Sequence, residues 1–227
     1  MNARLAWLAA CFCAALSGCN PPAAPSAGAT HRAAEQPAAW AAQIELVRRG
    51  EATAIVVDDE RLDDDDLAQL ETLDGLVELT LRNTAISNRG LSRLRKLSRL
   101  EKLVLGETTV TDAGLEPLLG LTQLRILNLE SASITSAGFE RLTALEELAL
   151  LRFGQSQIDD AGLACVEKWP KLRSLILQNA PISDAGLQQL SELNRLESLY
   201  LEGTKVTEEG LAGLQRALPA LHIHPHP

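Results

Sequence analysis

Few side chains in this sequence have the types and spacing that chemistry needs. His222, His224 and His226 alternate near the end of the chain, so in an extended segment they would share one side and bind a metal ion weakly. Two prolines interrupt them and no carboxylate is fixed nearby, which favours a frayed terminus instead. The fourth histidine, His31, lies far away, so the region between has no base for Ser/His/Asp or Cys/His catalysis.

The densest run of charge extends from Asp58 to Asp66. A calcium loop would need spaced oxygen ligands and a glycine turn, and this run has neither. We expect Asp63 to cap a helix and the run to form a solvated first turn that the helix dipole stabilises. Paired carboxylates for acid–base work stay open as an alternative, although no cleft is implied. We therefore expect no catalytic residue, no metal site and no cofactor, and predict that the chain is not an enzyme.

One repeated pattern of about 24 residues positions most of the remaining side chains. It reads L-x-x-L-x-L-x-x-T/A-x-I/V-S/T-x-x-G-L-x-x-L-x-x-L. Six copies begin at Leu76, Leu100, Leu124, Leu145, Leu172 and Leu196. A degenerate copy covers about 52–75, and a partial copy follows from Leu221. A fixed period of this length predicts a solenoid, in which each unit buries its apolar face against its neighbours.

Each position of the repeat has a physical role. Leucines that alternate, such as Leu79 and Leu81, predict a strand with these side chains inward. The isoleucine or valine that follows fills the turn, and the next residue, such as Ser87, is of a helix N-capping type. The glycine column, such as Gly90, indicates close approach between layers. Leucines three residues apart then suit a short helix on the outer side.

The pattern resembles the leucine-rich repeat family over about 52–221. The segments T-D-A-G-L (111–115), I-S-D-A-G-L (182–187) and V-T-E-E-G-L (206–211) look like repeats of bacterial surface proteins and like the cysteine-type repeats of eukaryotic F-box proteins. Nothing else resembles an F-box. The resemblance implies an α/β fold, a curved solenoid with a parallel sheet on its concave face and short helices on its convex face.

The bulk composition agrees with a repeated leucine core and excludes one class of partner. Hydrophobic residues make up 46% of the chain and aromatic residues only 3%. The formal net charge is −9, with no basic patch, so the surface repels phosphate backbones. We expect no nucleic-acid partner.

The first residues indicate export. A short basic start and the apolar segment 5–16 lead into Leu16-Ser17-Gly18-Cys19, which resembles the lipobox of bacterial lipoproteins. The resemblance implies that residues 1–18 are a lipoprotein signal peptide and that acylated Cys19 anchors the chain to a membrane. Asn20 follows in place of the aspartate of inner-membrane retention, which favours the outer membrane of a bacterial cell envelope. The alternative is an ordinary signal peptide with a chance cysteine.

The remaining chain divides into three parts. Residues 19–37 are rich in Pro, Ala, Ser and Gly and predict a flexible tether. Residues 38–51 predict an amphipathic capping helix, and 52–227 form the repeat domain. Cys165 is the one cysteine inside the repeats; we expect it to be partly exposed and unreactive.

Residues between the inward leucines should face a partner across the concave sheet. The repeat from Leu145 has three extra residues within Leu151–Gln157, which we interpret as a loop at the rim that presents Arg152 and Phe153. Aromatic, apolar and arginine side chains ringed by polar ones are typical of protein contacts. The predicted binding residues are Glu130, Leu151, Arg152, Phe153, Ile176, Gln178, Tyr200 and Glu202.

These observations predict a membrane-anchored module that binds an unidentified protein or peptide through its concave face. The alternative is a structural or adhesive protein of the cell envelope without one specific ligand. The alternative interpretation of the rim loop is that two compensating changes in repeat length produce it and that it has no function.

Overall fold

The structure, a computed structural model, describes residues 36–58, 62–106 and 108–224. The expected signal peptide, Cys19, nearly all of the tether, and His226 lie outside these residues.

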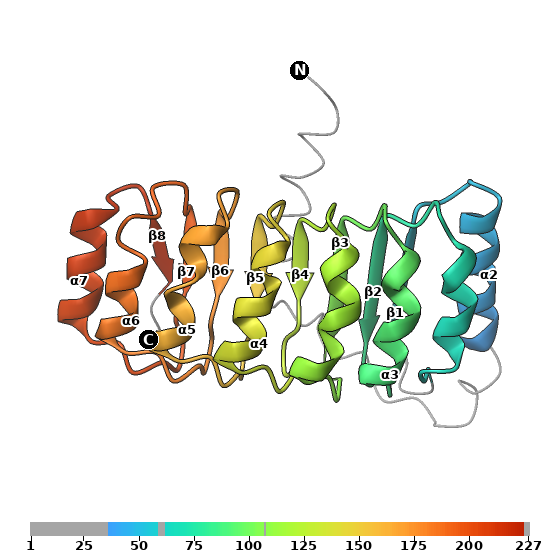
Figure 1. Cartoon of the computed structure of the whole chain (residues 1–227), viewed down its shortest axis with the longest axis horizontal. Helices are drawn as coiled ribbons and strands as arrows, with labels where there is room; N and C mark the ends of the chain where they lie inside the picture. The colour runs from blue at the N-terminus through green and yellow to red at the C-terminus, as the bar shows by residue number, and fades with distance from the viewer. Residues whose placement is uncertain (1–35, 59–61, 107, 225–227) are drawn as a thin grey trace, which may run out of the picture. The chain divides into compact units, whose positions relative to one another are not determined.

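A single sheet of eight parallel strands runs through the described part of the chain, in sequence order from β1 to β8 (Figure 1). The strands are β1 (Ala54–Asp58), β2 (Glu78–Arg82), β3 (Lys102–Gly106), β4 (Ile126–Asn128), β5 (Leu150–Arg152), β6 (Ser174–Ile176), β7 (Ser198–Tyr200) and β8 (His222–His224). The predicted leucine-rich repeat solenoid is thereby confirmed.

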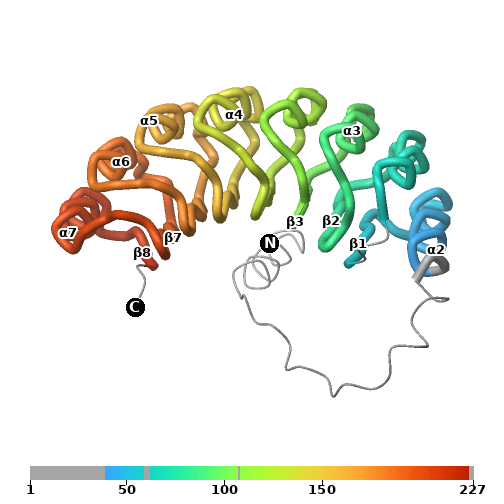
Figure 2. Tube along the Cα trace, turned by 90° about the horizontal axis from the view of Figure 1, so that it is seen from below, coloured from blue at the N-terminus to red at the C-terminus, as the bar shows by residue number. Residues whose placement is uncertain are grey.

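Short helices form the second layer and lie along the convex side of the arc of residues 36–224, while the strands line its concave side (Figure 2). The α-helices are α2 (Gln36–Arg48), α3 (Asn88–Leu91), α4 (Ser136–Arg141), α5 (Asp160–Leu163), α6 (Asp184–Gln189) and α7 (Glu208–Ala217). The 3₁₀ helices are η1 (Asp66–Thr72), η2 (Ser92–Lys96), η3 (Asp112–Gly114), η4 (Glu116–Gly120), η5 (Leu142–Ala144) and η6 (Val166–Lys168). Leucines fill the space between the layers.

The strand register corrects the expected irregularity of the repeat. Leu127 pairs with Leu151 and Leu151 with Leu175, the same step of 24 residues that separates Leu79 from Leu103. Leu148, not Leu145, is therefore equivalent to Leu124, and the sheet contains no extra residues at 151–157. The expected rim loop is wrong, because an unbroken period lets every strand add to the sheet in register.

Phe153 occupies the inward position that leucine fills in the other repeats, and it is fully buried. Its ring meets Phe139 edge-on at 5.2 Å between centroids, and Phe139 in turn meets Trp169 at 4.9 Å. The indole N–H of Trp169 donates to the carbonyl of Leu142 at 3.2 Å. This aromatic cluster (Phe139, Phe153 and Trp169) thus links two successive repeats.

A hydrogen-bonded ladder also joins each repeat to the next. The acceptor is the residue directly after the N-capping position: Asp112, for example, accepts from the backbone N–H of Thr135 at 2.9 Å and from its hydroxyl at 2.5 Å. Equivalent pairs are Asp64–Ser87, Asn88–Thr111, Ser136–Asp159, Asp160–Ser183 and Asp184–Thr207. We call the six side chains that directly follow the N-capping positions, the first member of each pair, the ladder.

The ladder explains the glycine column. A Cβ atom added at Gly138 would lie under 3.0 Å from the carboxylate of Asp112, and the equivalent holds at Gly90, Gly114, Gly162, Gly186 and Gly210. Only glycine leaves room for the ladder side chain of the preceding repeat.

Helix α2 closes the first layer of the solenoid. It buries Trp40, Ile44 and Val47 against the core. The amide of Gln43 donates to the carbonyl of Val56 at 3.1 Å and accepts from its N–H at 2.8 Å. One side chain thereby replaces the neighbouring strand that the edge of β1 lacks.

Candidate functional site on the concave face

The concave face consists of the side chains that lie between the inward positions of each strand. The central column, one residue from each strand, is Val56, Thr80, Val104, Asn128, Arg152, Ile176, Tyr200 and His224. The column that follows the strands includes Asp58, Arg82, Glu130, Gln178 and Glu202. Strands spaced about 4.8 Å apart place these side chains next to one another.

Arg152, on β5, begins the C-terminal half of this face. Its guanidinium donates to the Glu130 carboxylate at 2.8 Å and approaches the amide oxygen of Gln178 at 3.5 Å. Gln178 in turn donates to Glu202 at 2.8 Å. Partners from neighbouring repeats hold Arg152 in one orientation, with only 18% of its side chain exposed.

Apolar and aromatic groups complete this half of the face. Ile176 follows Arg152 in the central column and is 2% exposed, so it forms the floor. Tyr200 comes next and stacks on the imidazole of His224, with centroids 4.1 Å apart and planes 6° from parallel. Flat stacking restricts the rotation of the phenol ring, and a rigid ring suits contact with another molecule.

Six of the eight predicted binding residues therefore lie together: Glu130, Arg152, Ile176, Gln178, Tyr200 and Glu202. Together with His224 we call them the concave cluster. The expected exposure of Leu151 and Phe153 is wrong, since both are fully buried by the register shift of three residues. Gly154 instead occupies the position after β5 in the column that contains Glu130 and Gln178.

Sequence reasoning did not select His224, although a signal exists. It follows Tyr200 by one period, which puts it in the central column if the partial last copy forms a strand, as β8 does. Its neighbour His222 lies on the same face, because the two residues alternate around Ile223.

The N-terminal half of the concave face has a simpler polar pattern. Lys102 pairs with Glu78 at 3.3 Å and Asn83 donates to Asp58 at 2.7 Å. Val56, on the first strand, is 58% exposed. Lys102 and Glu78 neutralise each other here, and the central column of this half carries no aromatic side chain.

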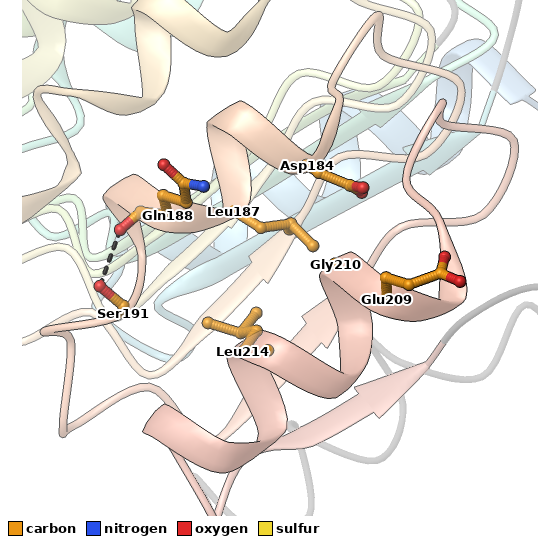
Figure 3. Close-up of a pocket in the computed structure, with 8 residues that line it drawn as sticks. Asp184, Leu187, Gln188, Ser191, Glu209, Gly210 and Leu214 are labelled. Atoms are coloured by element: carbon orange, nitrogen blue, oxygen red, sulfur yellow. Dashed lines mark hydrogen bonds between the residues drawn. The ribbon is translucent and has the colours of Figure 1, made fainter.

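Hollows on the convex side come from the repeat rather than from a specific site. One lies between α6 and α7, with Leu187, Gln188 and Gly210 in its lining (Figure 3). A second lies between α4 and α5, and its lining residues Glu140 and Gly162 sit two periods before Gln188 and Gly210. The glycine column produces both hollows.

No group of three or more His, Cys, Asp or Glu side chains within the described ranges could hold a metal ion.

Cys165, expected to be partly exposed, is buried instead, and its burial raises the pKa of the thiol to about 11. The described end of the acidic run leads into η1: Asp63 accepts from the N–H groups of Asp65 at 2.9 Å and Asp66 at 3.4 Å, although the N-cap position itself is Asp65, not Asp63. No helix within the described residues is long and apolar enough to cross a bilayer.

A parallel sheet with one strand and one helical segment per period defines the class: the chain is built of leucine-rich repeats. The family model described as Leucine Rich repeat matches residues 170–191, which include β6.

Two solved structures from Listeria monocytogenes share the fold. Internalin C2 is 25% identical, with a TM-score of 0.62 over 79% of this chain and 74% of that chain. Internalin F is 18% identical, with a TM-score of 0.50 over 79% of this chain and 62% of that chain. The comparison with curated proteins finds no match.

Proposed function

We propose that the protein is a binding module that recognises a protein or peptide segment through the concave cluster. The observation that carries this proposal is the arrangement around Arg152. Four adjacent strands, together with β8, bring a fixed guanidinium, an apolar floor, a stacked tyrosine and a row of polar side chains onto one surface.

The leucine-rich repeat fold supports a binding role in general, and the cluster supports this half of the face in particular. Tyrosine and arginine are the residue types that most often dominate protein interfaces, and here both are held in place before a partner arrives. Preorganisation lowers the entropy cost of association. The N-terminal half of the face lacks such a group.

Partner capture in the native envelope tests the proposal. The full chain would be fused to a proximity-labelling enzyme and compared with the variants Arg152→Ala and Tyr200→Ala. Arg141→Ala is the matched control, since Arg141 is exposed on the convex helix α4. A partner labelled by the wild type and the control, but lost from both concave variants, supports the proposal. Labelling that all four proteins share contradicts it and favours the structural or adhesive alternative.

We also propose that acylated Cys19 anchors the module to a membrane of the cell envelope, with the outer membrane favoured. The support is the segment Leu16-Ser17-Gly18-Cys19 directly after an apolar stretch. Cys19→Ser should abolish incorporation of a labelled fatty acid and move the protein from the membrane to the soluble fraction. Fatty-acid labelling that persists in this variant would contradict the anchor.

A further inference from the structure

The two ends of the solenoid differ in how they are finished. At the N-terminal end, α2 covers the core and Gln43 satisfies the edge of β1. At the other end, α7 and β8 form the last layer of the described chain (Figure 2). Val206, Leu211 and Ile223 in this layer are only partly buried. A half-covered apolar layer beside an open strand edge is a surface that favours association.

The edge of β8 offers one pair of backbone groups. His222 donates to the carbonyl of Glu197 at 2.9 Å, and the carbonyl of His224 accepts from Leu201 at 3.3 Å, so both face β7. Backbone groups alternate sides along a strand, which turns the N–H and C=O of Ile223 to the open edge. A second Ile223, related by a two-fold axis normal to the sheet, would exchange both hydrogen bonds as an antiparallel pair.

The outer stripe of α7 has the charge pattern that the same axis requires. Glu208, Ala212 and Arg216 are exposed and lie four residues apart, so they form one line along the helix. An antiparallel copy centred on the small side chain of Ala212 would place Glu208 opposite Arg216 of the copy, twice. Within the described residues, neither Glu208 nor Arg216 takes part in an ion pair.

Head-to-tail stacking is blocked, because α2 and Gln43 already cover the opposite end of the described solenoid. Contact between two copies of the end formed by α7 and β8 is isologous, and a two-fold axis closes such an assembly at two chains. We propose that the layer formed by α7 and β8 is a homodimer interface, in which two copies of this chain join their sheets and pack their last helices antiparallel. The interface uses the backbone edge of β8 and the outer stripe of α7, whereas the concave cluster uses the His224 side chain on the face of the sheet, so failure of the dimer would leave the proposed function intact.

Charge swaps test the pairing. The full chain with Cys19→Ala, to keep it free of lipid, should show a reversible monomer–dimer equilibrium in sedimentation experiments over a wide concentration range. Glu208→Arg and Arg216→Glu should each raise the dimer Kd by about tenfold, since each places like charges together twice. The double variant restores opposite charges and should return the Kd close to that of the wild type.

Two further variants keep the test sharp. Glu116→Arg, on the exposed side of η4, changes the net charge as Glu208→Arg does and should leave the Kd unchanged. Ala212→Arg places a large cation against its own copy at the axis and should abolish the dimer while the melting temperature stays that of the monomer. A wild type that stays monomeric, single variants without effect, or a double variant without recovery would each overturn the proposal.

Discussion

At the scale of single residues, the ladder and the glycine column act as one device. Each ladder side chain fills the space that a Cβ would occupy at the glycine of the next repeat, as Asp112 does at Gly138. Hydrogen bonds to a carboxylate contribute about 1.5–3 kcal/mol each, more than neutral ones. Asn88 shows that an amide can serve, since it bonds both the N–H and the hydroxyl of Thr111.

Gly138→Ala should therefore destabilise the fold by about 1–3 kcal/mol, because the added methyl group collides with the carboxylate of Asp112. Urea unfolding of the variant measures this change. Gly120→Ala is the matched control, since a Cβ there meets no atom within 4 Å. Equal loss of stability in the two variants would rule out the ladder as the reason for the glycine.

Cys165 makes a second prediction at this scale. Because burial raises the pKa of its thiol to about 11, little thiolate forms near neutral pH. A thiol reagent at pH 8 should modify native protein far more slowly than unfolded protein, with the rate followed by mass spectrometry. Equal rates would show that the Cys165 sulfur is exposed.

At the scale of elements, the register of β5 decides which side chains face a partner. Two overlapping matches compete there: Leu145, Leu148 and Leu150 fit the leucine pattern, but so do Leu148, Leu151 and Phe153 if phenylalanine replaces the last leucine. The second match keeps the period and buries Phe153 beside Phe139.

Phe153→Ala should accordingly cost about 3–5 kcal/mol of unfolding free energy, the usual loss for a large buried aromatic side chain. Arg152→Ala, one residue away on the concave face, should cost only about 1 kcal/mol, the worth of a partly exposed ion pair. The two melting curves distinguish the registers. If Arg152→Ala cost more stability than Phe153→Ala, the rim loop would be restored and Arg152 would not lie on the concave face.

Sequence periodicity thus predicts the strands, the inward leucines and the capping positions, because each depends on neighbours within one repeat. It fails at Phe153, where two matches lie three residues apart and only the packing of adjacent layers decides between them. The ladder escaped notice for a related reason. Asp112 looks like an ordinary acidic residue in a first helical turn until Thr135 of the next repeat is placed beside it.

At the scale of the whole molecule, the ladder couples stability to pH. Hydrogen bonds from the hydroxyl and N–H of Thr207 lower the pKa of Asp184 below its ordinary 3.8, and those from Ser136 and Gly162 lower that of Asp159. Burial opposes ionisation of Asp64, but the bonds from Ser87 and Arg89 outweigh it and lower its pKa too.

Groups whose pKa is lower in the folded state stabilise it above their unfolded pKa, and this contribution is lost as the pH falls through the folded value. The melting temperature should therefore decline below about pH 4, from the ordinary aspartate pKa. Asp184→Asn should flatten that decline, since Asn88 shows that the amide fits a ladder position. An unchanged slope would exclude Asp184 as a contributor.

The central claim is that the C-terminal half of the concave face meets the partner. Photo-cross-linking in the native envelope tests it most directly, with a photoreactive phenylalanine derivative in place of Tyr200 and, as the control, in place of Arg141 on the convex side. The account predicts a discrete cross-linked protein from position 200 and none from position 141. Cross-links from position 141 alone would contradict it.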